Sequence, residues 1–313
     1  MARSIKQRQA APLSAARPAR SRIVDSAIKH VSDTALWVAT FRAQEGHRAD
    51  AAFDDPLASI LAGERGRAIA HSISRATMVK WGIIIRTSAI DRLINEAVVA
   101  GIDTVLNLGA GLDTRPYRMK LPATLRWVEV DFPHIVELKN ATLVEHQPVC
   151  MLERVGMDLL DRPSRLELLA RYGATSKHTL VITEGVLAYL SVHEVAALAG
   201  ELHSTPPIRF WIQDFDNAGP GKLPRGWTAK LKAAPILFKV KDWFEFFDKY
   251  GWRSSHVITS LEESQRINRP YPLDFPFGLM LLALPKAMRQ KIQSLSGAVL
   301  MQRISDKQPR LSG

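Results

Sequence analysis

Cysteine is nearly absent from the sequence, since Cys150 is the only one among 313 residues. A single thiol excludes an intrachain disulfide, and with it the small disulfide-stabilised domains typical of secreted proteins. A catalytic thiol requires a positioned base, and the sequence identifies none. We therefore expect Cys150 to be a buried, small apolar residue in a cytoplasmic protein.

Long apolar runs and a signal peptide are also missing. The longest apolar run, FGLMLLAL at 277–284, is far shorter than the roughly 20 residues of a membrane helix, so we expect no membrane partner. Residues 1–24 hold six basic and no acidic residues and lack an apolar core, which predicts a disordered basic tail, with an organelle transit peptide as the alternative. This tail has no interleaved aromatic residues to stack on bases, so the net charge of +11 does not predict a nucleic-acid partner.

The rest of the sequence has the pattern of an α/β protein. Apolar residues at three- and four-residue spacing predict helices at 33–43, 55–63 and 81–101. Beyond Asp103, short β-rich runs alternate with helical or loop segments, which indicates a doubly wound, mostly parallel seven-stranded sheet. The predicted strands are 104–109, 126–131, 149–158, 178–185, 208–215, 252–259 and 277–284.

These elements predict one domain over residues 25–290. It would consist of an N-terminal helical cap (25–101) and a Rossmann-like core (102–290). The segment 216–235, rich in Gly, Pro and Lys, is predicted to be a lid insertion after the fifth strand. Residues 291–313 are predicted to be a C-terminal tail.

The ends of the first two predicted strands carry the strongest signal for a ligand. Gly109 and Gly111 permit positive φ or close approach of the backbone. Asp131 follows Gly111 by 20 residues, where a carboxylate can bind a ribose diol, although it could also cap the next helix. The pattern favours an adenosine-containing ligand, either a nicotinamide dinucleotide or S-adenosylmethionine. Thr114, at the third glycine position of G-x-G-x-x-G, disfavours the dinucleotide.

Other polar residues leave two interpretations each. Asp158 and Leu159 could contact an adenine, or Asp158 could cap a helix. Glu184 could neutralise a cationic ligand or be a carboxylate at the sheet edge. Arg86 lies on the apolar face of a predicted helix and needs an anion, which is either a core acid or a ligand carboxylate.

Five motifs, RTSAIDRL, NLGAGLDTRPYR, VEVDFP, DLLD and EGVLAYL, occur in this order. They resemble the leucine carboxyl methyltransferases and the tetracenomycin-type polyketide O-methyltransferases grouped with them. The resemblance covers about residues 41–203, with FDDPLA at 53–58 similar to a further family element. It implies a class I S-adenosylmethionine-dependent methyltransferase fold, with S-adenosylmethionine as cofactor and no metal.

The resemblance also implies roles for individual residues. Apart from the resemblance, Arg115 and Arg118 are interpreted as structural residues that pair with neighbouring acids. Arg42 is a candidate for the family's N-terminal basic contact, although a charge on the helix surface is the simpler interpretation. The implied cofactor contacts are Arg86 (methionine carboxylate), Gly109 and Gly111 (methionine-side loop), Asp131 (ribose), Asp158 and Leu159 (adenine) and Glu184 (methionine moiety), and Tyr189 would face the acceptor.

The sequence thus predicts an O-methyltransferase that acts on a carboxyl or hydroxyl oxygen of a small, polyketide-like acceptor. Two alternatives stay open. One is an NAD(P)-dependent Rossmann oxidoreductase, and the other is a non-catalytic module that binds S-adenosylmethionine.

Overall fold

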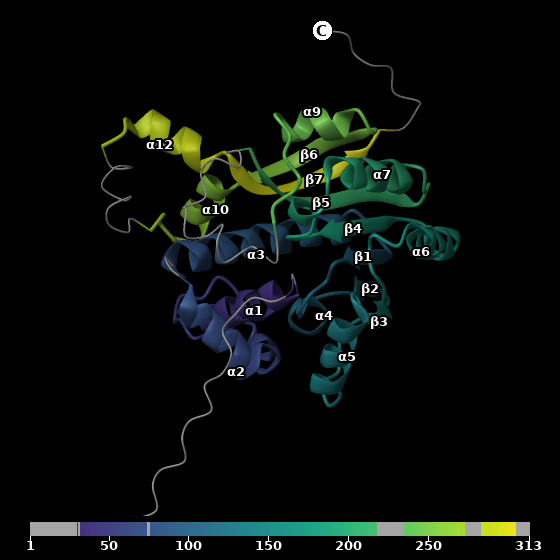
Figure 1. Ribbon diagram of the computed structural model, residues 1–313, viewed down its shortest axis with the longest axis horizontal. Helices are drawn as coiled ribbons and strands as arrows, with labels where there is room; N and C mark the ends of the chain where they lie inside the picture. Colours follow the sequence, from purple (N-terminus) through teal and green to yellow (C-terminus); the bar gives the residue numbers. More distant parts are fainter. Residues whose placement is uncertain (1–29, 31, 74–75, 218–234, 273–282, 305–313) are drawn as a thin grey trace, which may run out of the picture.

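The computed structural model describes residues 30, 32–73, 76–217, 235–272 and 283–304. Within them, a seven-stranded sheet has the order β3-β2-β1-β4-β5-β7-β6 (Figure 1). β7 pairs antiparallel with both β5 and β6, and the other pairs are parallel. The predicted mostly parallel α/β sheet is confirmed. Its strands are β1 (Thr104–Leu108), β2 (Arg126–Asp131), β3 (Met151–Gly156), β4 (Thr179–Thr183), β5 (Ile208–Asp216), β6 (Trp252–Thr259) and β7 (Ser296–Arg303).

Helices cover both faces of this sheet, as a doubly wound fold requires (Figure 1). One face packs an apolar stripe of α3, including Ile90 and Leu93, against Val105 and Leu180. The other face packs α6, α7 and α9 against residues such as Val128. The helices are α1 (Asp33–Gly46), α2 (Pro56–Ser72), α3 (Ala76–Val99), α4 (Arg115–Arg118), α5 (Pro133–Thr142), α6 (Arg162–Thr175), η1 (Leu187–Tyr189), α7 (Val192–His203), α9 (Trp243–Asp248), α10 (Ser260–Arg266) and α12 (Lys286–Gln293).

The helices α1, α2 and α3 occupy the predicted cap region. The second one is longer than predicted because it continues beyond Gly63. Gly63 has φ 56° and ψ −164°, so the helix kinks there instead of ending. α1 and α2 pack tightly, since a Cβ on Gly66 would lie 2.6 Å from the carbonyl oxygen of Leu36. This pair of helices covers the loop after β1 through contacts with Leu112.

The seventh strand lies at Ser296–Arg303, which corrects the predicted C-terminal tail over 291–313. Apolar content alone predicted the seventh strand at 277–284. In the structure, the seventh strand is the segment that pairs antiparallel with both β5 and β6. Of the segment 277–284, only residues 283 and 284 are described, and they form a bend or turn. The predicted tail 1–24 and most of the predicted lid lie outside the described residues.

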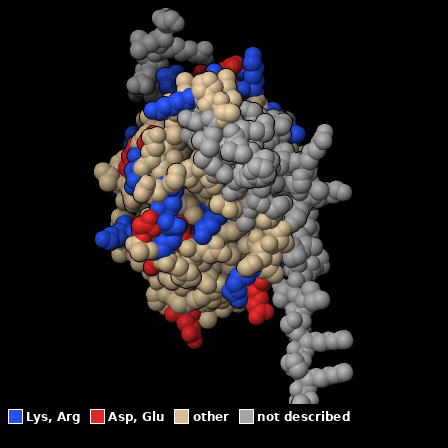
Figure 2. All heavy atoms as spheres, turned by 90° about the vertical axis from the view of Figure 1, so that its left-hand side faces the viewer, with Lys and Arg blue, Asp and Glu red and all other residues tan. Residues whose placement is uncertain are grey.

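Three further observations bear on the compositional predictions. Cys150 is buried, as predicted, and burial raises the pKa of its thiol to about 11. No helix in the described part of the chain has the length and apolar character to cross a bilayer. Figure 2 shows the side of the molecule at the left of Figure 1, where basic and acidic side chains are interspersed on a mainly uncharged surface.

Candidate active site

A cavity of about 690 Å³ lies at the carboxyl ends of the parallel strands. This volume falls within the range of about 300–1,000 Å³ found for small-molecule sites. Residues at or just after the carboxyl ends of β1 to β5 all contribute to its lining. The eight residues predicted to contact the cofactor or the acceptor all line this one cavity: Arg86, Gly109, Gly111, Asp131, Asp158, Leu159, Glu184 and Tyr189.

The loop after β1 depends on its two glycines. Gly109 and Gly111 have φ values of 70° and 48°, which are unfavourable for residues with a Cβ. A Cβ on Gly109 would lie only 2.3 Å from Cγ2 of Val186. The amides of Gly109 and Ala110 donate to the carbonyl oxygen of Val130, at 2.7 and 3.0 Å. The loop is therefore held against β2, where Asp131 lies.

Asp131 ends β2 with its carboxylate on the cavity lining. Oδ2 accepts the Gly111 amide at 2.6 Å, and Oδ1 accepts the Phe132 amide at 2.7 Å. A carboxylate has about four acceptor positions, so these two bonds leave capacity for hydroxyl donors. Burial raises the pKa of Asp131, and the two amide hydrogen bonds oppose this effect.

Asp158 and Leu159 line the cavity beyond β3. Oδ1 of Asp158 accepts the Leu160 amide at 2.9 Å. The N-cap position of α6 belongs to Asp161, so Asp158 is not the cap that the sequence allowed. Phe132 also lines this part of the cavity and offers an apolar ring there.

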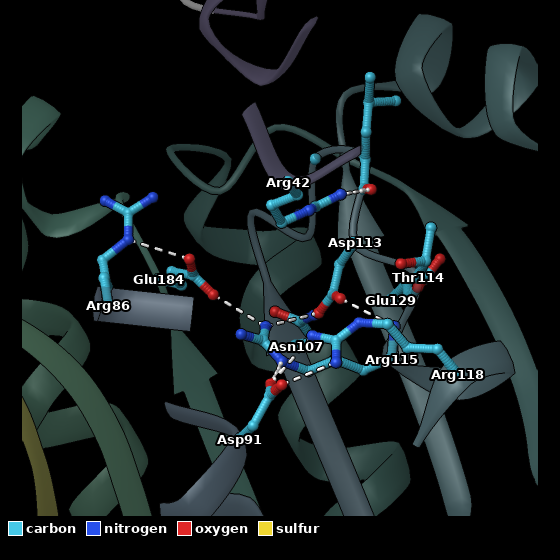
Figure 3. Close-up of polar contacts among 12 residues, drawn as sticks. Arg42, Arg86, Asp91, Asn107, Asp113, Thr114, Arg115, Arg118, Glu129 and Glu184 are labelled. Atoms are coloured by element: carbon cyan, nitrogen blue, oxygen red, sulfur yellow. Dashed lines mark hydrogen bonds and ion pairs between the residues drawn. The ribbon is translucent and has the colours of Figure 1, made fainter. Parts of the chain in front are cut away.

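Glu184, at the end of β4, is held between two arginines (Figure 3). Oε1 accepts from Nε of Arg86 at 2.9 Å, and Oε2 accepts from Nη1 of Arg115 at 2.8 Å. Burial alone would raise the pKa of Glu184, but Arg115 and Arg86 outweigh burial and lower the pKa to about 2. Glu184 is therefore an anion at neutral pH rather than a carboxylate exposed at the sheet edge.

Arg115 and Arg118 pair with neighbouring acids, as predicted. The Arg115 guanidinium also contacts Asp91 at 2.6 Å and Asp113 at 2.9 Å. Arg118 contacts Asp91 at 2.7 Å. Burial would raise the pKa of Asp113, but Arg115 and other cations hold it well below its usual range. The network fixes the loop after β1 to α3 and to Glu184.

Arg86 pairs with core acids and also lines the cavity, so the two interpretations from the sequence do not exclude each other. Its Nη1 donates to Oδ2 of Asp214 at 3.2 Å, in addition to the Glu184 contact. A guanidinium has five N–H donors. Because the side chain is 25% exposed at the cavity, donors remain for the carboxylate of a ligand.

Tyr189 ends the short helix η1 and lines the same cavity. Burial raises the pKa of Tyr189, while a hydrogen bond with Thr34 and the charge of Arg86 oppose that effect. The phenol keeps its proton at neutral pH and can donate a hydrogen bond.

Among the charged lining residues, Asp214 was missed from the sequence and Arg42 was misjudged. Asp214 lies near the end of β5 and lines the cavity. The sequence feature that identified Glu184, an acid at the end of an apolar strand, also applies to Asp214. Arg42 is buried rather than on the helix surface, and its Nε lies 3.0 Å from Oδ2 of Asp55. It also donates to the carbonyl oxygen of Leu112. Only the docking of α1 on the β1 loop reveals this position.

The cavity has two sides that differ in chemistry. The β1–β3 side follows the ends of β1, β2 and β3 and contains the glycine loop, Asp131 and Asp158. The β4–β5 side has a large apolar surface, and α3, which packs on β5, supplies much of it. Its apolar lining residues are Trp37, Val38, Val79, Trp81, Gly82, Ile83, Ile85, Phe215 and Leu237, and polar groups are added by Glu184, Asp214, Asp216, Ser260 and Ser296.

The sheet order and this carboxyl-edge cavity define a Rossmann-like methyltransferase fold. The structure is similar to that of a candidate methyltransferase from Thermobifida fusca, with a TM-score of 0.56 over 90% of this chain and 96% of that one. It is also similar to a DUF574 family protein from Streptomyces avermitilis, with a TM-score of 0.50 over 85% and 96%. The sequence identity is 16% in both cases, so the similarity concerns the fold.

The family model of the leucine carboxyl methyltransferases matches residues 35–203. A candidate S-adenosyl-L-methionine-dependent methyltransferase of Frankia alni is 36% identical over 258 residues, covering 76% of this chain and 87% of that one. One of Streptomyces coelicolor is 32% identical over 259 residues, covering 76% and 88%. The chain therefore belongs to the leucine carboxyl methyltransferase family, and it is an enzyme that uses S-adenosylmethionine as cofactor.

Proposed function

We propose that this enzyme methylates a carboxyl or hydroxyl oxygen of a small, apolar, polyketide-like acceptor. The observation that carries the proposal is the division of one cavity into two sides. The β1–β3 side has the acids and the glycine loop that suit a nucleoside joined to an amino acid. The β4–β5 side has the aromatic and aliphatic walls that suit an apolar compound.

The residues of the β1–β3 side fit S-adenosylmethionine one by one. Asp131 would hold the ribose hydroxyls with the acceptor positions that its two amide bonds leave. Asp158 and Leu159 would contact the adenine, and Gly109 and Gly111 would let the backbone approach the amino-acid part. When bound, the cofactor supplies a methyl group on a positively charged sulfur.

The charges at the boundary between the two sides also suit this cofactor. Glu184 and Asp214 contact Arg86, and Glu184 also contacts Arg115. With Asp91, Asp113 and Arg118, these connected residues have four carboxylates and three guanidiniums. This local excess of negative charge favours a ligand that carries an ammonium and a sulfonium. Arg86 can bind the methionine carboxylate with its remaining donors and still hold both acids in position.

Tyr189 supports an oxygen acceptor because it keeps its proton and lies on the cavity lining. A phenol that donates a hydrogen bond can orient an acceptor oxygen toward the methyl group. We assign it a positioning role, since methyl transfer depends mainly on alignment and on the exclusion of water.

Calorimetry with S-adenosylhomocysteine tests the cofactor assignment. We expect Asp131→Ala to weaken binding by about 10- to 100-fold, the value of one or two charged hydrogen bonds. Asp103→Ala is the matched control, because Asp103 also accepts backbone amides, from Lys177 and His178, but precedes β1 at the opposite edge of the sheet. Equal losses in both variants would refute a ribose contact for Asp131.

A transfer assay tests the acceptor atom. The enzyme is incubated with methyl-labelled S-adenosylmethionine and a panel of aromatic phenols, carboxylic acids and amines. We expect label on oxygen, and we expect Tyr189→Phe to lower kcat without changing the affinity for S-adenosylhomocysteine. Label recovered only on amines would refute the assignment as an O-methyltransferase.

A further inference from the structure

Packing and a hydrogen bond hold the aromatic side chains on the β4–β5 side of the cavity in place. Trp37, Val38, Val79 and Ile83 belong to one apolar cluster that joins α1 to the first half of α3. The indole of Trp81 is fixed by a hydrogen bond of 2.8 Å from Nε1 to the carbonyl oxygen of Arg269. Held aromatic walls of this kind favour flat, apolar ligands.

One glycine on this side of the cavity lies inside a helix, where glycine is unfavourable. Gly82 lies inside the 24-residue helix α3, on the stretch that lines the cavity. Glycine in a helix interior costs about 1 kcal/mol relative to alanine. A residue with this cost usually has a packing or functional reason.

Close packing is not the reason at Gly82. A Cβ built there meets no atom of the described residues within 4 Å. At Gly66 of α2, by contrast, a Cβ would lie 2.6 Å from a backbone oxygen of α1, so helix packing explains that glycine. Among the described residues, Gly82 therefore leaves open space, and it lines the cavity.

We propose that Gly82 is the residue that sets the size of the methyl acceptor. The ring system of the acceptor lies against the α3 backbone at Gly82, between the indoles of Trp37 and Trp81 and the Phe215 side chain. This inference rests on the proposed function, because it takes the β4–β5 side as the acceptor side. Arg86 lies one helical turn further along α3, so an acceptor seated at Gly82 has its reactive end close to Arg86 and Glu184.

The test compares Gly82→Ala and Gly82→Leu with the same substitutions at Gly200. Gly200 is the matched control because it also lies inside a helix, α7, and also has no described atom within 4 Å of a built Cβ. It does not line the active-site cavity. The probes are 2-naphthol and 2-naphthoic acid with two rings, phenol and benzoic acid with one ring, and decanoic acid without a ring. Their binding to the protein saturated with S-adenosylhomocysteine is measured by calorimetry.

We expect a two-ring probe to bind wild type more tightly than its one-ring counterpart and than decanoic acid. The isobutyl group of Gly82→Leu should weaken the binding of the two-ring probe by about tenfold or more, which is the effect expected of overpacking. Binding of S-adenosylhomocysteine should change by less than about twofold, since the two sides are separate. Gly200→Leu should change neither the affinity for the two-ring probe nor the affinity for S-adenosylhomocysteine.

The outcomes separate this inference from the proposed function. Wild type that fails to bind S-adenosylhomocysteine refutes the proposed function itself. Normal cofactor binding with unchanged two-ring affinity in Gly82→Leu refutes only the role of Gly82. Two-ring probes that do not bind, or decanoic acid that binds more tightly, refute the assignment of a flat acceptor. Gly82→Ala should raise the melting temperature in every case, which confirms that the helix tolerates the change.

Discussion

The charge of Glu184 should contribute to folding in a pH-dependent way, and Glu184→Gln measures that contribution. The substitution keeps the shape of the side chain and removes the anion between Arg86 and Arg115. The pKa of Glu184 falls from 4.5 to about 2 in the folded protein. Because the folded pKa is the lower one, the stabilisation is present above pH 4.5 and is lost as the pH falls toward 2.

The size of the effect follows from the two pKa values. A difference of this size corresponds to about 3 kcal/mol at pH 7 and about 1 kcal/mol at pH 3. The carboxylate is only 12% exposed, so solvent screening is small. We therefore expect Glu184→Gln to lower the free energy of unfolding by about 3 kcal/mol at pH 7, and by about 1 kcal/mol at pH 3.

Urea denaturation at pH 7, 5, 4 and 3 measures this difference. Glu245→Gln is the control, because Glu245 pairs with Lys249 on the surface and is 68% exposed. An exposed pair contributes about 0–1 kcal/mol, so this variant should show a small and nearly constant difference. A Glu184→Gln difference that is equal at pH 7 and pH 3 would refute the electrostatic argument.

Three further predictions concern single residues. Arg86→Leu should lower the affinity for S-adenosylhomocysteine by about tenfold with unchanged circular dichroism, and Arg92→Leu on the same helix should leave the affinity unchanged. Gly109→Ala should lower the melting temperature more than Gly101→Ala, since both have positive φ but only the Cβ at Gly109 meets a neighbouring side chain. Cys150 should react with a thiol reagent at the rate of unfolding, because it is buried and its pKa is about 11.

Much of the β1–β3 side was predictable because its signals are local. Gly109, Gly111 and Asp131 stand directly after apolar strands, and parallel strands bring their carboxyl ends to one edge. Asp214 had the same signal, but the β-rich run continues past it to Phe215, so the strand was not seen to end there. The seventh strand was misplaced because apolar content does not reveal which segment pairs antiparallel with β5 and β6.

The sequence by itself determined six of the seven strands, the class of enzyme and most of the residues at the strand ends, because each depends on periodicity or on a motif within a few residues. The tertiary structure alone decided which charges meet. Arg42 reaches the cavity only because α1 docks on the β1 loop, and Arg86 finds Glu184 and Asp214 across about a hundred residues of chain or more. It also placed Gly82 on the cavity lining with no described atom close to a built Cβ, because the space beside a helix is a property of the packed fold and not of the residue.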